Sequence, residues 1–265
     1  MRNPVTDAHV WLGRWPYGPL PAANAREIID KLDELGIERA VVSAPQSILY
    51  KDAHRANAEL AAEAAAAGSR FLLAATLNPA EPGWEKDLAE AHSWGMRALD
   101  LHPNYHGYDV VSSPALEIAR AASALGWPVL ITARMQDERQ QHRLGRVQPV
   151  PVPAIANAVR ASPSVRFLVR GLSYFEIQQL LGLARVVKNW WVTFERAHVP
   201  QNVVPLLIAE AGAERLVYAS MYPFQYAEST WLKVAGATDV TRPQQEQLLA
   251  GNAARVFGGS SRQGG

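Results

Sequence analysis

The sequence contains no cysteine, and that absence narrows the chemistry open to the protein. It excludes disulfide bridges, thiolate ligands to a metal ion and a cysteine nucleophile. Because structural disulfides belong to oxidising compartments, a cysteine-free chain fits a reducing one. We therefore expect a cytoplasmic protein.

Long apolar runs and an excess of charge of one sign are also lacking. No segment approaches the roughly 20 apolar residues of a membrane-spanning helix, and the first residues, MRNPVTDAH, contain no apolar leader core. The 26 Lys and Arg residues nearly balance the 25 Asp and Glu residues, which leaves a net charge of +1. Without a long-range field to attract nucleic acid or an anionic membrane, we expect neither as a partner. We expect a small-molecule substrate.

What the sequence does contain is an alternation of short β-branched apolar runs with longer segments rich in Ala and Leu. This alternation is typical of βαβ units, and nearly all-apolar strands are expected where both faces of a parallel sheet are buried. Eight runs are strand candidates: 5–12, 39–43, 71–76, 97–101, 129–132, 165–169, 191–194 and 216–220. The helix candidates are 24–35, 53–67, 84–94, 114–125, 152–161, 175–183 and 203–211, with a C-terminal pair that begins near 226 and 243.

Eight such units in 265 residues fit a single-domain (β/α)8 TIM barrel of the α/β class. A doubly wound sheet would usually show fewer strands and a Gly-rich phosphate-binding turn after the first strand. No repeat or low-complexity run divides the chain. We predict a barrel over residues 1–258 and a flexible C-terminal tail over 259–265.

In a TIM barrel the active site is built from residues at the carboxyl ends of the strands. The first strand candidate ends in Asp7, His9 and Trp11, and a Gly-containing loop follows. The other strand ends supply a larger set: Asp100, His102, Tyr105, His106, Thr132, Arg134, Asp137, Arg139, His142, Arg170, Glu195, Arg196, His198, Ser220, Met221 and Tyr222.

Five segments, in chain order, carry a resemblance to a known family: VTDAHVWLG, ALDLHPNYHGYDV, PSVRFLVRGLSYFE, RLVYASMYPF and GNAARVFG. They resemble the amidohydrolase-related family of metal-dependent (β/α)8 hydrolases and decarboxylases, which includes aminocarboxymuconate semialdehyde decarboxylase. LHPNYHGY and the final GNAARVFG are the more specific of these segments. The resemblance spans nearly the whole chain and implies a barrel enzyme, either a hydrolase of C–N or C–O bonds or a decarboxylase-type lyase.

Most of the metal ligands that this resemblance implies are replaced, and one of five remains. A divalent transition metal needs three or four converging ligands, so a single His cannot hold it. We therefore expect no metal and no other cofactor, with recruitment of His102 or His106 as a non-standard ligand left as the alternative. The matching positions are His9 and Trp11 for the first-strand His pair, Thr132 for the fifth-strand His, Arg170 or Gly171 for the sixth-strand His, and Met221 for the eighth-strand Asp.

Charged side chains near the carboxyl ends of the strands offer a substitute for the metal. Most of them lie in the segment TARMQDERQQH after the fifth strand. Arginine forks bind carboxylates or phosphates, and a nearby His or Asp can move a proton. We predict that the catalytic residues are His9, Asp7, Asp137 and His142. The predicted substrate-binding residues are Trp11, as a wall of the pocket, together with His102, His106, Arg134, Arg139, Arg170, Glu195 and Tyr222.

Each of these residues also has a purely structural interpretation. His9 can be a hydrogen-bonded core imidazole, Asp7 can tie a strand end to a loop, and Glu195 can belong to a structural ion pair. Two functional hypotheses therefore stand. The first is a metal-independent hydrolase or lyase that acts on a small anionic or cyclic substrate, and the second is a non-catalytic barrel that serves as a binding or assembly partner. The number of titratable groups at the mouth favours the enzyme, and either hypothesis is compatible with a homo-oligomer.

Overall fold

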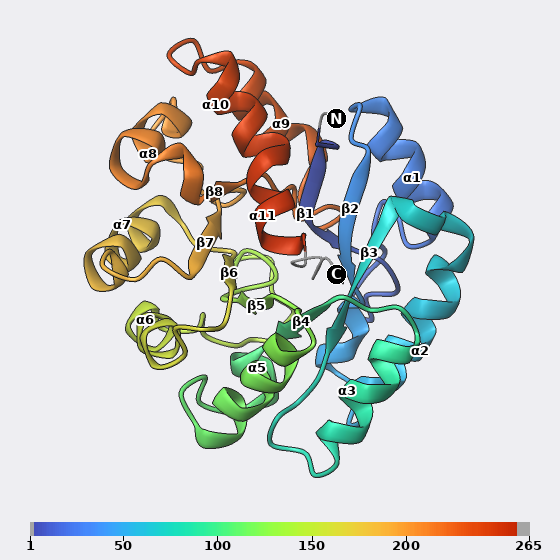
Figure 1. Cartoon of the computed structure of the whole chain (residues 1–265). Helices are drawn as coiled ribbons and strands as arrows, with labels where there is room; N and C mark the ends of the chain where they lie inside the picture. Colours follow the sequence, from blue (N-terminus) through green and yellow to red (C-terminus); the bar gives the residue numbers. More distant parts are fainter. Residues whose placement is uncertain (1–2, 259–265) are drawn as a thin grey trace, which may run out of the picture.

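The alternating strands and helices form the predicted TIM barrel. The computed structural model describes residues 3–258, in which eight parallel strands pair in sequential order within a surrounding layer of helices (Figure 1). Main-chain hydrogen bonds between β1 and the segment after β8 bring the two edges of the sheet together, for example Met221 N to His9 O at 2.8 Å. The predicted tail, 259–265, lies outside the described residues. The strands are β1 (Thr6–Trp11), β2 (Arg39–Ser43), β3 (Phe71–Thr76), β4 (Ala98–Leu101), β5 (Val129–Thr132), β6 (Phe167–Arg170), β7 (Trp190–Thr193) and β8 (Leu216–Val217).

Helices with polar caps and apolar inner faces cover the outside of the sheet. The first helix begins with a capping box, in which the Asn24 side chain accepts from Glu27 N and the Glu27 carboxylate accepts from Asn24 N. The helices are α1 (Ala25–Glu34), α2 (Ala53–Ala64), α3 (Trp84–Ser93), α4 (Pro103–His106), α5 (Ser113–Ala124), α6 (Val152–Ala161), α7 (Tyr174–Ala184), α8 (Val203–Ala211), α9 (Ala227–Ala235), α10 (Arg242–Glu246) and α11 (Asn252–Phe257).

Two segments differ from their prediction for local reasons. The eighth strand was predicted over 216–220 but ends at Val217, because Tyr218 N bonds to Leu248 O and Ser220 N bonds to a side chain rather than to a neighbouring strand. The HPNYH segment, which lies outside all the predicted helices and strands, forms the one-turn helix α4. Proline at its first position and the left-handed Gly107 after its end, with φ +69°, favour that short helix.

The core has an outer layer between sheet and helices and an inner layer inside the barrel. The inner layer combines small Ala side chains with larger Val and Leu side chains, which together fill the interior of the barrel. At the amino-terminal end of the strands, Ala253 and Val256 of α11 join this layer and close the barrel. The strand residues in the layer are Ala8, Val41, Ala74, Ala98, Leu130, Leu168 and Val217.

A β-bulge in β1 determines the direction in which the His9 side chain points. Asp7 pairs with Ala40 and Val10 pairs with Val42, so the two residues between them face Val41 alone. Such a bulge re-aims a side chain next to a functional site. Here the second bulged residue is His9, whose side chain contacts the end of β7 across the barrel.

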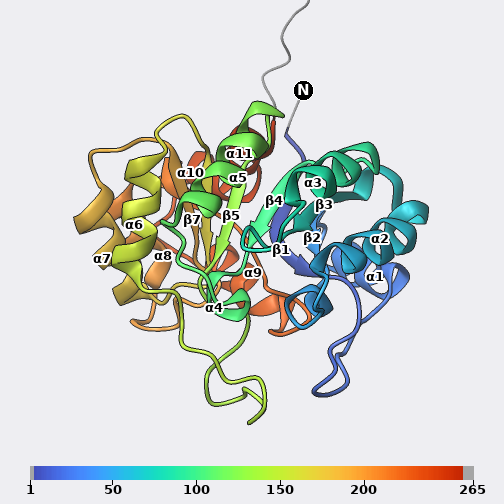
Figure 2. The same cartoon turned by 90° about the horizontal axis from the view of Figure 1, so that it is seen from below.

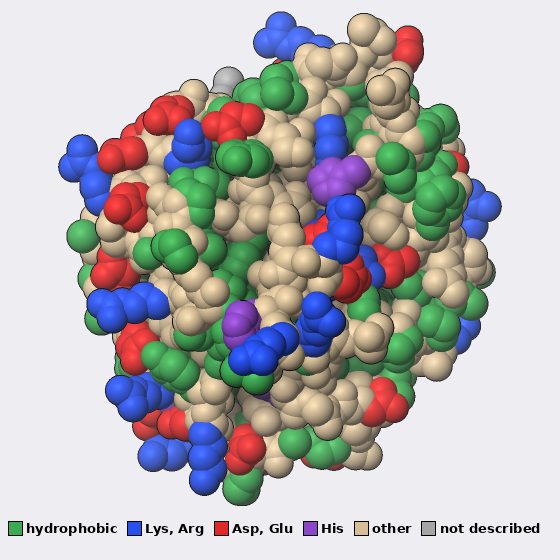
Figure 3. Space-filling view, turned by 180° about the vertical axis from the view of Figure 1, so that it is seen from behind, with side chains coloured by type: hydrophobic (Ala, Val, Ile, Leu, Met, Phe, Trp, Pro, Cys, Tyr) green, Lys and Arg blue, Asp and Glu red, His purple; other side chains and the backbone are tan. Residues whose placement is uncertain are grey.

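The carboxyl ends of the strands meet at one end of the barrel, from which the loops after β1 and β5 extend furthest (Figure 2). On this face basic, acidic and histidine side chains gather across the middle (Figure 3). We call it the mouth face. Within residues 3–258 no helix is both long and apolar enough to cross a membrane.

Asn252 provides a test of how the C-terminal helix is attached. Its side-chain amide is fully buried and donates to Ala213 O at 2.6 Å and Leu216 O at 2.7 Å. Asn252→Leu should lower the free energy of unfolding by about 2–4 kcal/mol, because it leaves two buried carbonyls without donors. The matched control is Asn157→Leu on the exposed face of α6, expected within about 0.5 kcal/mol of the parent. Equal effects of the two substitutions in urea unfolding would contradict this assignment.

Candidate active site

The bulged His9 is paired with Glu195, the second residue after β7. His9 Nδ1 lies 2.9 Å from Glu195 Oε1, and the same oxygen accepts from Gly171 N at 3.1 Å. Both side chains are fully buried. Strands β1, β6 and β7 thus fix one imidazole and one carboxylate at the mouth end of the barrel.

The surroundings of this pair set its protonation. Burial, followed by the charge of Arg170, lowers the pKa of His9 to about 4, against the opposing effect of Glu195. Burial alone would raise the pKa of Glu195, but the hydrogen bond and charge interaction with His9 outweigh it and bring that pKa to about 2. At neutral pH a neutral imidazole therefore donates its Nδ1–H to an ionised carboxylate. Its Nε2, which has no hydrogen-bond partner in the described part of the chain, is left as a proton acceptor.

Next to this pair, the guanidinium of Arg170 lies in the middle of the barrel. Arg170 Nη2 contacts Asp100 Oδ2 and lies 2.7 Å from Thr132 Oγ1. Asp100 also accepts from Ser43 Oγ at 2.6 Å and from Thr132 Oγ1 at 3.0 Å. Burial would raise the pKa of Asp100, but the charge of Arg170 and the neighbouring His102 hold it well below its usual range. The result is an ion pair with 0% exposure of either side chain that ties β2, β4, β5 and β6 together.

This arrangement does not fit a divalent metal at the barrel axis. The Thr132 hydroxyl is bonded to Asp100 and Arg170, and the thioether of Met221 packs in an apolar cluster. A side chain at position 171 is excluded, because a Cβ on Gly171, whose φ is +78°, would lie 2.6 Å from the main-chain oxygen of Arg134. The cation that occupies the axis is a guanidinium.

Within residues 3–258, three metal-ligating side chains converge only at His54, Asp87 and Glu90, which lie on α2 and α3 outside the barrel. His54 Nε2 already lies 3.2 Å from Glu90 Oε2. The Asn57 amide is fixed by Thr76, to whose carbonyl oxygen it donates, and it also directs an N–H toward His54 Nδ1 at 3.3 Å. That donor favours the tautomer with the proton on Nε2, the atom a metal would need. The cluster is better explained as a hydrogen-bond network.

Aromatic and apolar side chains cover the buried polar groups. Trp11, Ile48, Met135 and Met221 form a buried cluster, with Trp15, Leu49, Tyr105 and Phe224 packed against it. We call this cluster the plug. The centre of the Arg170 guanidinium lies 5.8 Å from the centre of the Trp11 ring. Trp11 connects the plug to the fully buried His9–Glu195 pair, since its ring centroid lies 5.1 Å from that of His9.

Several buried polar atoms beneath and beside the plug lack partners in the described structure. The ring centroids of His102 and His106 lie 6.2 Å apart, and His102 Nε2 lies 3.3 Å from Asp100 Oδ2. Burial and the neighbouring His102 lower the pKa of His106 to about 4, so this ring is neutral at pH 7. Because unpaired buried polar atoms are costly, such a concentration indicates a place that water or a ligand enters. The atoms are His9 Nε2, Trp11 Nε1, His102 Nδ1 and Tyr105 OH.

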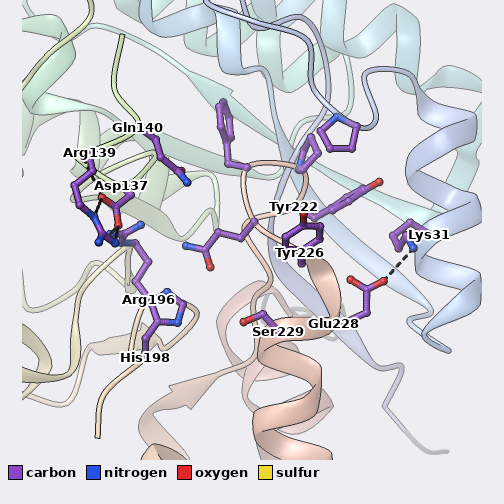
Figure 4. A pocket seen from close by; sticks show the side chains of 14 residues that line it. Lys31, Asp137, Arg139, Gln140, Arg196, His198, Tyr222, Tyr226, Glu228 and Ser229 are labelled. Atoms are coloured by element: carbon purple, nitrogen blue, oxygen red, sulfur yellow. Dashed lines mark hydrogen bonds and ion pairs between the residues drawn. The ribbon is translucent and has the colours of Figure 1, made fainter. Parts of the chain in front are cut away.

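Beside the plug, a pocket of about 700 Å³ opens on the mouth face (Figure 4). One wall carries Arg139, Arg196 and Asp137, and the opposite wall carries Tyr222 and Tyr226. We call this cavity the mouth pocket. At the far side of it, Lys31 Nζ pairs with Glu228 at 3.1 Å.

Arg196 is the best placed anion-binding group of this pocket. Its side chain is 10% exposed, and its nearest acceptors are Asp137 Oδ2 at 3.5 Å and Glu138 Oε2 at 3.9 Å. Its Nε is buried and has no partner within residues 3–258. Asp137 is also bound by Arg139 through two bonds of 2.9 Å, which together with Arg196 keep its pKa far below the usual range. A carboxylate entering the pocket would meet a guanidinium with unused hydrogen-bonding capacity.

The structure sorts the predicted residues into groups. His9, Trp11, His102, His106, Arg170 and Glu195 lie together under or in the plug, and Asp137, Arg139 and Tyr222 line the mouth pocket. Two lie apart from both. Arg134 forms a two-pronged ion pair with Glu176, and His142 stacks on Tyr17 at 4.7 Å.

Asp7 lies between β1 and the segment that follows β8. Its Oδ1 accepts from Ser220 N at 2.9 Å and from His9 N at 3.1 Å. Burial is the largest influence on its carboxyl and raises its pKa to about 7, despite these hydrogen bonds. The side chain therefore ties the two edges of the sheet together and stays partly protonated near neutral pH.

Two residues of the mouth pocket, Arg196 and His198, were not among the assigned site residues, and neither was Asp100 beneath the plug. All three follow strands, so the strand-end rule that identified their neighbours also points to them.

A family model for amidohydrolases matches residues 6–259. The chain belongs to the amidohydrolase family. Among solved structures, this amidohydrolase is similar to 2,6-dihydroxybenzoate decarboxylase from Rhizobium, with a TM-score of 0.73, 16% identity and coverage of 97% of this chain and 99% of that one. It is also similar to a probable 2-pyrone-4,6-dicarboxylic acid hydrolase from Acinetobacter baumannii with citric acid bound, with a TM-score of 0.71, 15% identity and coverage of 97% and 100%.

A third similar structure is a dihydroxybenzoic acid decarboxylase from Polaromonas with bound manganese and an inhibitor, with a TM-score of 0.73, 14% identity and 97% coverage of both chains. No curated protein matches this amidohydrolase. At these identities the likeness to the solved structures is one of fold. The family assignment agrees with the predicted class, a hydrolase or decarboxylase-type lyase.

The buried carboxyl of Asp7 provides a pH test. A folded-state pKa of about 7 against 3.8 when exposed means that Asp7 favours the folded state below pH 3.8 and that this contribution is lost as the pH rises through 7. Asp7→Asn should remove that dependence, so the variant gains stability relative to the parent between pH 5 and 8, by up to about 3 kcal/mol. Urea unfolding at both pH values measures it, with the exposed Asp239→Asn as control. A parent and variant with parallel pH profiles would refute the buried acid.

Proposed function

We propose that this protein is a metal-independent hydrolase or decarboxylase-type lyase that acts on a small carboxylated ring compound. The observation that carries the proposal is the buried His9–Glu195 pair, whose imidazole Nε2 is unprotonated and unpartnered within the described residues. An imidazole whose other nitrogen is held by a carboxylate has a defined tautomer and direction, as a general base requires. His9 would take or return a proton at Nε2, and Glu195 would orient its ring.

The buried charges near His9 determine where the carboxylate of a substrate binds. Arg170 and Asp100 neutralise each other, and Glu195 adds a negative charge next to His9. A substrate carboxylate is therefore disfavoured beside His9, because a second buried anion would be repelled. Arg196 and Arg139 in the mouth pocket offer the complementary position. The carboxylate would bind there, with the ring directed toward the plug.

Aromatic walls fit a planar ring. Tyr222 and Phe224 both line the mouth pocket, and Phe224 packs edge-on against Trp11, with ring centroids 6.0 Å apart. Planar rings are recognised by such edge and face contacts. Two similar structures are named for carboxylated ring substrates, 2,6-dihydroxybenzoate and 2-pyrone-4,6-dicarboxylic acid, which supports this substrate class.

The plug must open for chemistry to occur. Met221 is fully buried and adopts φ +62°, a conformation that is strained for a residue with a long side chain. Its main-chain N–H donates to His9 O, so a change at this residue is transmitted directly to β1. Displacement of the Met221 and Phe224 side chains would connect the mouth pocket to His9.

The test of the base uses 2,6-dihydroxybenzoate and 2-pyrone-4,6-dicarboxylate as probe substrates. His9→Asn should lower kcat by about 10²–10⁴-fold, and Glu195→Gln should lower it less, since the ring remains but loses its orienting charge. Activity should fall as the pH drops toward the His9 pKa of about 4, because the base becomes protonated. Metal content of the purified protein and activity after chelation are measured in parallel. Stoichiometric metal whose removal abolishes turnover would overturn metal independence, and an active His9→Asn variant would overturn the base.

Carboxylate binding is tested separately at Arg196. Arg196→Met should raise the KM for 2-pyrone-4,6-dicarboxylate about tenfold or more and leave kcat less affected, because the fork would hold a carboxylate away from the ring ester that is hydrolysed. The control is Arg242→Met on α10, whose side chain is 88% exposed. If both variants keep the parent KM, the carboxylate does not bind at Arg196.

A further inference from the structure

Lys233 lines a second cavity behind the mouth pocket. This cavity, of about 460 Å³, lies between the segment after β7 and helix α9 and is also lined by His198, Asn202 and Leu232. His198 borders both this cavity and the mouth pocket. The proposed function assigns no role to either the cavity or the amine.

The amine of Lys233 contacts a main-chain carbonyl oxygen and an imidazole nitrogen. Its Nζ donates to the main-chain oxygen of Glu195 at 2.9 Å and lies 3.3 Å from His198 Nδ1. In the part of the chain that the structure describes, no carboxylate comes within ion-pair distance of it, whereas Lys31 is paired with Glu34 and Glu228. The charged groups that face it belong to the segment after β7: Glu195, Arg196 and His198.

Burial lowers the pKa of Lys233 to about 8, with Arg196 adding to this effect and Glu195 opposing it. At pH 7.5, the fraction of Lys233 in the neutral amine form is then more than about a hundredfold larger than that of an ordinary lysine. Burial together with Lys233 and Arg196 also lowers the pKa of His198, which keeps that imidazole neutral. A neutral amine beside a neutral imidazole, in a cavity, is the arrangement used for attack on a carbonyl carbon.

We propose that Lys233 is a covalent site for a small aldehyde or α-keto acid, with His198 as its proton relay. The Nζ lone pair forms a C–N bond to the carbonyl carbon, and the carbonyl oxygen becomes an alkoxide. His198 Nδ1 accepts a proton from the resulting ammonium and returns it to the alkoxide, which gives a neutral carbinolamine. The nitrogen lone pair then expels the hydroxyl group while the remaining N–H proton passes through Nδ1 to that leaving oxygen, so amine and carbonyl compound give an imine and one water.

The experiment traps the imine in the full-length protein. Glyoxylate and sodium cyanoborohydride are added at pH 7.5, and peptide mass spectrometry follows the five lysines of the chain separately. Lys233 should be alkylated at least about tenfold faster than the exposed Lys51 and Lys86, and this ratio should shrink as the pH rises toward 10, where the exposed lysines also lose their protons. Labelling of Lys233 no faster than that of Lys51 would overturn the site.

Two variants separate the amine from the relay. Lys233→Arg keeps a donor to Glu195 O and should abolish the fast adduct, while Lys51 and Lys86 label as before. His198→Asn should slow the labelling of Lys233 about tenfold or more, since the relay is lost while the amine remains. An unchanged rate in His198→Asn would remove His198 from the proposal. All readouts are mass shifts, so they are independent of turnover at His9.

Discussion

The buried ion pair between Arg170 and Asp100 is the interaction on which the mouth of this barrel depends. Its members come from β6 and β4, and the hydroxyls of Ser43 and Thr132 extend it to β2 and β5. A buried charge left without its partner is strongly destabilising, so neither residue can change alone. The pair therefore constrains its surroundings: Trp11 covers it, and Thr132 is occupied by it.

Around that fixed pair, the molecule separates proton chemistry from recognition. His9 and Glu195 are fully buried, which strengthens their mutual interaction, whereas Arg139 and Arg196 lie in an open pocket. Phe224 belongs to both regions, because it lines the pocket and packs against the plug. Since His9 is fully buried, side chains have to move before a substrate can reach its imidazole.

Much of the fold could be predicted from the sequence because strands buried on both faces leave a strong apolar signal. The eighth strand was overestimated, since the apolar run 216–220 continues past the point where Asp7 and Leu248 take its amides. The helix at 103–106 was missed because four residues are too few to show a period.

For the site, the rule that active-site residues follow the strands located the right region. It could not distinguish the residues that line the site from those bound to other parts of the structure. Arg134 and His142 follow β5 just as Asp137 does, but their partners, Glu176 and Tyr17, come from distant segments. The bulge that turns His9 inward is likewise invisible as a pattern, because it depends on the register between β1 and β2. The position of a residue in the sequence predicts the end of the barrel at which its side chain lies. Whether that side chain is already bound to another residue depends on contacts with distant segments.

The guanidinium of Arg170 has a consequence for how the charges of the site are assembled. Arg170 is part of the chain and is buried together with Asp100, so the positive charge beneath the plug is put in place by folding itself.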